Sequence, residues 1–191
     1  MLQSLNNIFF KQQKQRSRWI PPPHDFFFFL KKKKKKTNYD GVVFLVENRS
    51  CIGVAIRNNR GFVMASLVQQ LPQAYQAIEI EAMATSRAME FGREITVAKV
   101  IVEGDSAIMV KPLCSSDTSL ASYGLLMKDT TIYSSLFLEL TYSYTTRESN
   151  RIAHSLAKQA VFFLYSMVWI YNVPPITSFV QADEATFDEF E

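Results

Sequence analysis

The sequence contains few of the residues that most often build metal clusters or crosslinks. It has two cysteines, Cys51 and Cys114, and two histidines, His24 and His154. The cysteines lie far apart and match neither the paired spacing of a zinc site nor a disulfide framework. We therefore expect reduced, packed thiols, and we exclude a metal site built mainly from histidine.

Long apolar runs are also missing. No run reaches the roughly 18 residues that a membrane-spanning helix needs, and we interpret residues 161–170 as the buried face of a C-terminal helix. Residues 1–18 have no apolar stretch before their charges, so we predict no secretory signal. An intracellular protein, nuclear or cytoplasmic, is expected. An organellar transit peptide is the alternative, because these residues include basic side chains and no acids.

A broadly basic surface is absent as well. The whole chain has a formal charge of +3, to which the lysine run at residues 31–36 contributes six positive charges. Residues 37–191 contain eleven Lys and Arg against seventeen Asp and Glu, a net charge of −6. Any binding of phosphate must therefore depend on local cations or on a metal ion.

Composition divides the chain into three parts. Residues 1–36 form a basic, low-complexity leader with a triple proline and runs of Phe and Lys, and residues 173–191 form an acidic tail. We expect the lysine run to be solvated, with nuclear import or contact with an RNA backbone as the alternative. Residues 37–172, in a chain that is 48% hydrophobic, are predicted to form one α/β domain.

Hydrophobic periodicity and turn residues predict an alternating order of strands and helices. A hairpin turn is predicted at Asn58-Asn59-Arg60, and a glycine at Gly104 ends a compact apolar strand. The expected strands are residues 39–45, 52–57, 61–68, 97–102 and 137–145, and the expected helices are residues 77–91, a short segment after Ser106, residues 123–136 and residues 149–169.

Three carboxylates stand where these elements begin or end: Asp40, Glu81 and Asp105. Each alone is more often a turn residue, a charge at a helix start or a loop residue. Together they form a set of hard oxygen ligands of the kind that Mg²⁺ prefers. Three crowded carboxylates would repel one another without a cation, which favours a metal site.

The settings of these acids, together with Arg147-Glu148-Ser149-Asn150-Arg151-Ile152-Ala153-His154-Ser155-Leu156-Ala157, resemble the ribonuclease H type 1 family. Trp19-Ile20-Pro21-Pro22-Pro23 and Asn38-Tyr39-Asp40-Gly41 are similar to its plant retroelement-derived, reverse-transcriptase-like branch. The resemblance covers nearly all of the chain after Trp19. It implies a ribonuclease H-like α/β fold with a mixed five-stranded sheet, whose first three strands form an antiparallel meander flanked by helices.

The resemblance also implies an activity, the metal-dependent endonucleolytic hydrolysis of the RNA strand of RNA–DNA hybrids. Asp40, Glu81 and Asp105 would be catalytic metal ligands, and His154 would occupy the fourth catalytic position. Two ions of Mg²⁺ or Mn²⁺ are expected. The expected partner is an RNA–DNA hybrid or other nucleic acid, with no membrane and no second subunit.

The sequence departs from the family at two of these positions. His154 stands where Asp is common, and an imidazole lacks the negative charge and favours Mn²⁺ over Mg²⁺. Tyr144 stands where many of the nucleases carry a mobile histidine. A helix histidine paired with a neighbour is the alternative for His154. Glu79 and Glu103 occupy variable positions, and we interpret both as surface charges.

Two other functions are consistent with the sequence. One is a catalytically weakened or inactive nucleic-acid-binding domain derived from a retroelement. The other is a protein-interaction domain that uses the acidic tail or the aromatic residues Phe162, Phe163 and Tyr165. Retention of the three acids counts against both, because an idle cluster of acids costs stability through repulsion.

Overall fold

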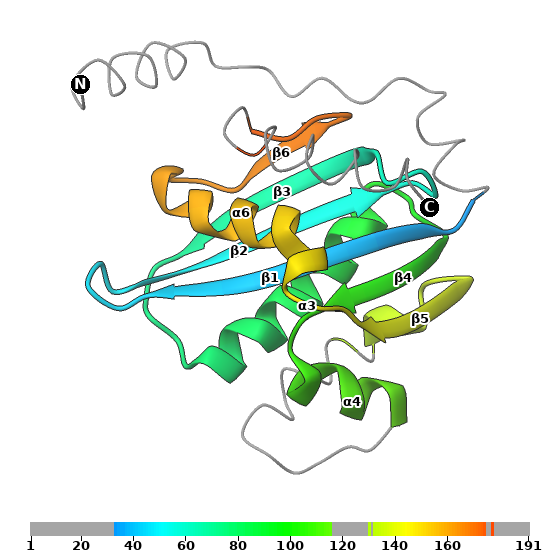
Figure 1. Cartoon of the computed structure of the whole chain (residues 1–191), viewed down its shortest axis with the longest axis horizontal. Helices are drawn as coiled ribbons and strands as arrows, with labels where there is room; N and C mark the ends of the chain where they lie inside the picture. The colour runs from blue at the N-terminus through cyan, green and yellow to red at the C-terminus, as the bar shows by residue number, and fades with distance from the viewer. Residues whose placement is uncertain (1–32, 116–129, 131, 175–176, 178–191) are drawn as a thin grey trace.

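The computed structural model describes residues 33–115, 130, 132–174 and 177, which form a six-stranded sheet with helices on both faces (Figure 1). The strand order is β5-β4-β1-β2-β3-β6. The strands are β1 (Lys35–Phe44), β2 (Arg49–Arg57), β3 (Val63–Leu71), β4 (Lys99–Gly104), β5 (Glu139–Tyr144) and β6 (Met167–Ile170). The helices are α3 (Ala77–Glu94), α4 (Ala107–Ser115) and α6 (Arg151–Gln159), with short 3₁₀ helices η1 (Glu148–Asn150) and η2 (Ala160–Phe162).

The first three strands form the expected antiparallel meander, and β4 and β5 continue the sheet in parallel. The turn between β2 and β3 is fixed by Asn58, whose side-chain oxygen accepts hydrogen bonds from the backbone nitrogens of Arg60 and Phe62. Gly61 follows with a φ of 78°, a conformation that favours glycine. The mixed sheet with an antiparallel meander of its first three strands, predicted from the sequence, is therefore present.

The prediction of one long helix over residues 149–169 is wrong. Helix α6 ends at Gln159, and β6 pairs antiparallel with residues 65–68 of β3 as a sixth strand. Residues 161–170 contain several aromatic and β-branched side chains, which favour a half-buried strand. The sheet therefore has six strands where five were expected, and the extra strand lies at the edge beyond β3.

The remaining described elements lie within a few residues of their expected positions, although β1 begins at Lys35 where the sequence predicted residue 39. The helix expected over residues 123–136 falls largely outside the described residues, and residues 132–134 at its end are helical. Residues 1–32 and most of the acidic tail are also outside them, so the domain boundaries stay predictions. In the described part of the chain, no helix combines the length and apolar character that a membrane crossing requires.

The two faces of the sheet carry separate cores. On one face α3 packs Ile80 and Phe91 against Tyr39 of β1. On the other face, α6 packs Ile152 and Leu156 against β2 and β3 (Figure 1). Cys51 lies in this second core as a free, fully buried thiol, and burial raises its pKa to about 11, as expected for a packed, reduced cysteine.

Gly53 allows α6 to lie directly on β2. A Cβ at this position would be 2.3 Å from both the carbonyl oxygen of Ala153 and the backbone nitrogen of Ala157. Gly53 is paired in register with Asp40 on β1. The close approach therefore brings the N-terminal half of α6 over the strand segment that carries Asp40.

Replacing Gly53 with alanine should push α6 away from the sheet. We expect Gly53→Ala to lower the free energy of unfolding by about 1–3 kcal/mol, the usual cost of overpacking. Gly92→Ala is the matched control, because its Cβ would meet only the ring of Phe137 at 3.4 Å, and alanine favours a helix. Urea unfolding measures both, and equal stabilities would contradict the packing.

Candidate active site

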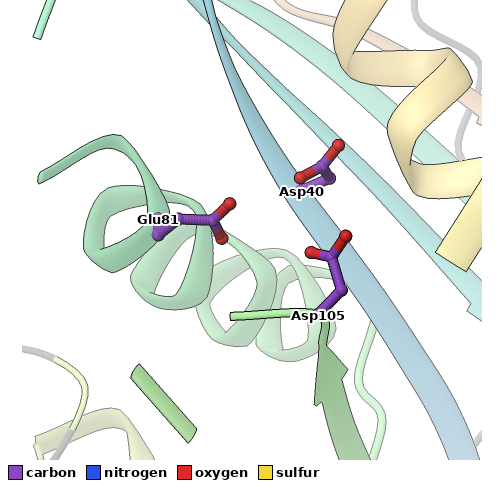
Figure 2. A group of neighbouring side chains, drawn as sticks. All are labelled: Asp40, Glu81 and Asp105. Atoms are coloured by element: carbon purple, nitrogen blue, oxygen red, sulfur yellow. The ribbon is translucent and has the colours of Figure 1, made fainter. Parts of the chain in front are cut away.

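Three elements bring the predicted acids together. Asp40 lies in the middle of β1, Glu81 in the second turn of α3, and Asp105 directly after the last residue of β4. One oxygen of each carboxylate lies within 4.8 Å of the others. Figure 2 shows the three side chains pointing toward one another. This is the only such group of metal-ligand side chains among the described residues.

Two glycines permit this convergence. A Cβ on Gly41 would lie 2.8 Å from the side chain of Ile80, so α3 crosses β1 in close contact immediately beside Asp40. Glu81 is the next residue on that helix. A Cβ on Gly104 would lie 2.4 Å from the ring of Tyr39, which packs beneath the end of β4. The small residues therefore bring the helix and both strands close to one another at the three acids.

Burial and the repulsion between carboxylates oppose the ionisation of Asp40 and Glu81. Asp40 is 2% exposed, and burial raises its pKa, with a further rise from the charge of Asp105. Burial, together with the charges of Asp40 and Asp105, raises the pKa of Glu81 to about 9. The Oε2 atom of Glu81 is buried and has no hydrogen-bond partner among the described residues. The cluster therefore offers an oxygen-only donor set that a cation would stabilise.

His154 lies on α6 and contacts the same aspartate. Its Nδ1 atom is 2.5 Å from Oδ2 of Asp40, and both of its ring nitrogens are 3.4 Å from Nη2 of Arg147. His154 is outside the group of three acids that share a common centre. The geometry is that of a helix histidine paired with a neighbour, and its role as the fourth catalytic residue stays a prediction.

Two further residues near the acids, Arg147 and Asn150, belong to the motif at residues 147–157, but neither was predicted from the sequence as a site residue. Arg147 is exposed, and its positive charge offsets a small part of the rise that burial causes in the pKa values of Asp40 and Glu81. Asn150 is 1% exposed, and its Nδ2 atom donates to the backbone oxygen of Tyr39 at 2.9 Å. Asn150 thus joins the beginning of α6 to β1 one residue before Asp40. Its spacing from the acids in sequence gives no signal of this contact.

The interpretation of Glu103 as a surface charge is wrong. It is 7% exposed, its Oε2 accepts from Nδ2 of Asn38 at 3.3 Å, and its Oε1 lies 3.2 Å from Nζ of Lys36. Glu103 on β4 lies opposite Asn38 on β1, so β1 provides both partners, Asn38 and Lys36. Glu79, in contrast, accepts a hydrogen bond from the backbone nitrogen of Gln76 and stabilises the start of α3. Tyr144, at the end of β5, is 53% exposed.

A protein-family model described as reverse transcriptase-like matches residues 38–160. The chain belongs to this family. The match includes all three acids and His154, and it ends before β6. Among curated proteins, no sequence matches this member of the reverse transcriptase-like family.

Solved structures of ribonucleases H share the fold. One is the N-terminal RNase H domain of Rv2228c from Mycobacterium tuberculosis, which was solved as a fusion with maltose binding protein. It superposes with a TM-score of 0.60 at 19% sequence identity, and the match covers 69% of this chain and 95% of that one. RNase H1 from Halobacterium salinarum gives 0.59 at 17% identity, with 68% and 98% covered. LC11-RNase H1, solved in complex with an RNA/DNA hybrid, gives 0.58 at 19% identity, with 67% and 96% covered. At these identities the likeness shows the fold alone.

Proposed function

We propose that this protein hydrolyses the RNA strand of RNA–DNA hybrids as a metal-dependent endonuclease. The observation that carries the proposal is the convergence of Asp40, Glu81 and Asp105 within 4.8 Å. The ribonuclease H fold and the hybrid bound to one of its structural neighbours support the choice of substrate. The proposed partner is an RNA–DNA hybrid, bound by a monomer inside the cell.

The three acids fit a divalent cation. All the metal-binding atoms are carboxylate oxygens, and Oε2 of Glu81 is a buried acceptor with no hydrogen-bond donor among the residues that the structure describes. Asp40, Glu81 and Asp105 would hold Mg²⁺ or Mn²⁺, and we propose two ions. A bound divalent ion acts as a Lewis acid toward a phosphate oxygen and lowers the pKa of a bound water.

The chain's own residues would orient the reacting groups. Asn150 joins the start of α6 to β1, and Gly53 allows α6 to lie on the neighbouring strand β2. His154 contacts one carboxylate oxygen of Asp40. As a donor, the imidazole would fix the orientation of that carboxylate. The exposed guanidinium of Arg147 adds a positive charge beside the acids, where a substrate phosphate would be attracted.

A catalytically weakened or inactive nucleic-acid-binding domain is the second candidate. It is favoured by His154, which supplies no negative charge at the fourth position and already contacts Asp40. This candidate predicts binding of hybrids that survives loss of Asp105 and is accompanied by no turnover. The proposed nuclease predicts turnover that depends on Asp105.

Hydrolysis of a labelled RNA–DNA hybrid by the full-length chain tests the proposed function. We expect cleavage of the RNA strand with Mn²⁺ and weaker cleavage with Mg²⁺, because an imidazole suits Mn²⁺ better. Asp105→Asn should abolish cleavage because it removes one of the three acids. Glu79→Gln is the control, since Glu79 caps α3 away from the cluster. Folded protein that cleaves with neither ion would contradict the proposal.

His154→Asp should raise the rate of hydrolysis with Mg²⁺, on the order of tenfold, the smaller end of the effect of altering groups around a metal site. The new carboxylate would add negative charge beside Asp40. Ser155→Asp introduces the same side chain one position along α6 and is the control. An unchanged or lower rate in His154→Asp would show that His154 does not stand in for an acidic ligand.

A further inference from the structure

A hollow of about 960 Å³ lies beside the beginning of β1, at a distance from the three acids. Lys36 and Ile101 contribute from two neighbouring strands. The turn at residues 58–61 borders it on one side, and residues 148–151 at the start of α6 border it on another. None of the three acids lines it, so it is separate from the candidate active site.

Lys36 at the hollow and Asp40 of the candidate active site lie on the same face of β1. Side chains alternate along a strand, so Lys36, Asn38 and Asp40 share one face of β1. His154 on α6 contacts Asp40, which identifies this as the α6 face. Lys36 is four residues from Asp40, about 13 Å along an extended strand. At a rise of about 3.4 Å per nucleotide in a stacked strand, the separation corresponds to about four nucleotides.

The hollow concentrates positive charge, with Glu148 as the one acid among its lining residues. Lys34, Lys36, Arg57 and Arg151 line it as exposed or half-buried cations. Lys35 also lines it but is 3% exposed. Three of its cations come from the lysine run at residues 31–36, and Arg57 and Arg151 come from residues 37–191, whose net charge is −6. Local positive charge of this kind attracts a phosphate backbone.

Hydrogen bonds hold Arg57 in place at the hollow, and an ion pair holds Lys36. Arg57 donates from Nε and Nη2 to Oδ1 of Asn38, at 3.1 and 2.9 Å. Asn38 in turn donates to Glu103, which also pairs with Lys36. Glu103 and Asn38 are buried, so this network is a fixed part of the sheet face. The exposed ion pair of Lys34 with Glu139 is weak and does not prevent contact with a phosphate.

We propose that this hollow binds the unpaired continuation of the RNA strand that is cut at the three acids. The proposal rests on the proposed function, because that function places a substrate strand on the same face. A volume of about 960 Å³ is that of a small-ligand pocket, which suits a few nucleotides of a single strand better than a duplex. Its cations contact the sugar-phosphate backbone, so binding is independent of sequence.

Binding of hybrids by the full-length chain, measured by fluorescence anisotropy in a chelator, tests the proposal. The probes are a blunt hybrid and the same hybrid with eight unpaired RNA nucleotides added at one end or the other. We expect one of the two extensions to tighten binding. Lys36→Gln combined with Arg151→Gln should remove that gain and reduce the slope of log affinity against log salt by about 1.4, or about 0.7 per lost phosphate contact on a single strand.

The matched control is Arg93→Gln combined with Lys158→Gln, which removes two exposed cations that do not line the hollow. This control should keep the gain. Lys34→Gln combined with Arg151→Gln is a second test that leaves the contact between Lys36 and Glu103 intact. No gain from either extension, or an equal loss in the control, overturns the proposal. Tighter binding after loss of the cations also overturns it.

Hydrolysis of the blunt hybrid with Mg²⁺ or Mn²⁺ separates the two proposals. If an extension raises the affinity but the blunt hybrid is not cut, the result supports the RNA-binding hollow and contradicts the nuclease function. If the blunt hybrid is cut but neither extension raises the affinity, the result supports the nuclease function and contradicts the RNA-binding hollow.

Discussion

The repulsion among three carboxylates held within 4.8 Å of one another is the constraint on which the candidate site depends. The sheet and α3 fix Asp40, Glu81 and Asp105 before any ligand binds. Asp40 is buried and the other two are half-buried, which limits the screening of their charges by water. A proton on Glu81 relieves the repulsion by removing one of the negative charges, whereas a divalent cation relieves it by compensating them. A cation would do so without loss of the negative charges that bind it.

Glycine contacts supply the rigid frame that maintains this arrangement. Gly41 admits α3 on one face of the meander, and Gly53 admits α6 on the other. Asp40 lies between these two approaches, because it precedes Gly41 and pairs with Gly53. The strand therefore carries its acid at the point where both helices come closest. The same α6 contact brings His154 and Arg147 to the acids.

The sequence predicted the acids better than it predicted their surroundings. Asp40, Glu81 and Asp105 could be found because their flanking residues and their order match a known family pattern, although Asp40 lies in the middle of β1 and not at its end. Glu103 could not, because its burial depends on Asn38 and Lys36 of a strand that is distant in sequence. The strand at residues 167–170 was taken for helix because a short apolar run has no decisive period. Its pairing with β3 is a tertiary contact.

Titration of the metal-free protein with Mn²⁺, followed by the electron paramagnetic resonance of the free ion, tests the central claim most directly. The account predicts saturable binding that is lost in Glu81→Gln and kept in Glu103→Gln, whose acid lies on the same face outside the cluster. Affinity should rise with pH below about 9, because the ion displaces the proton that the raised pKa of Glu81 retains. Equal binding by both variants, or none by the parent chain, would contradict the account.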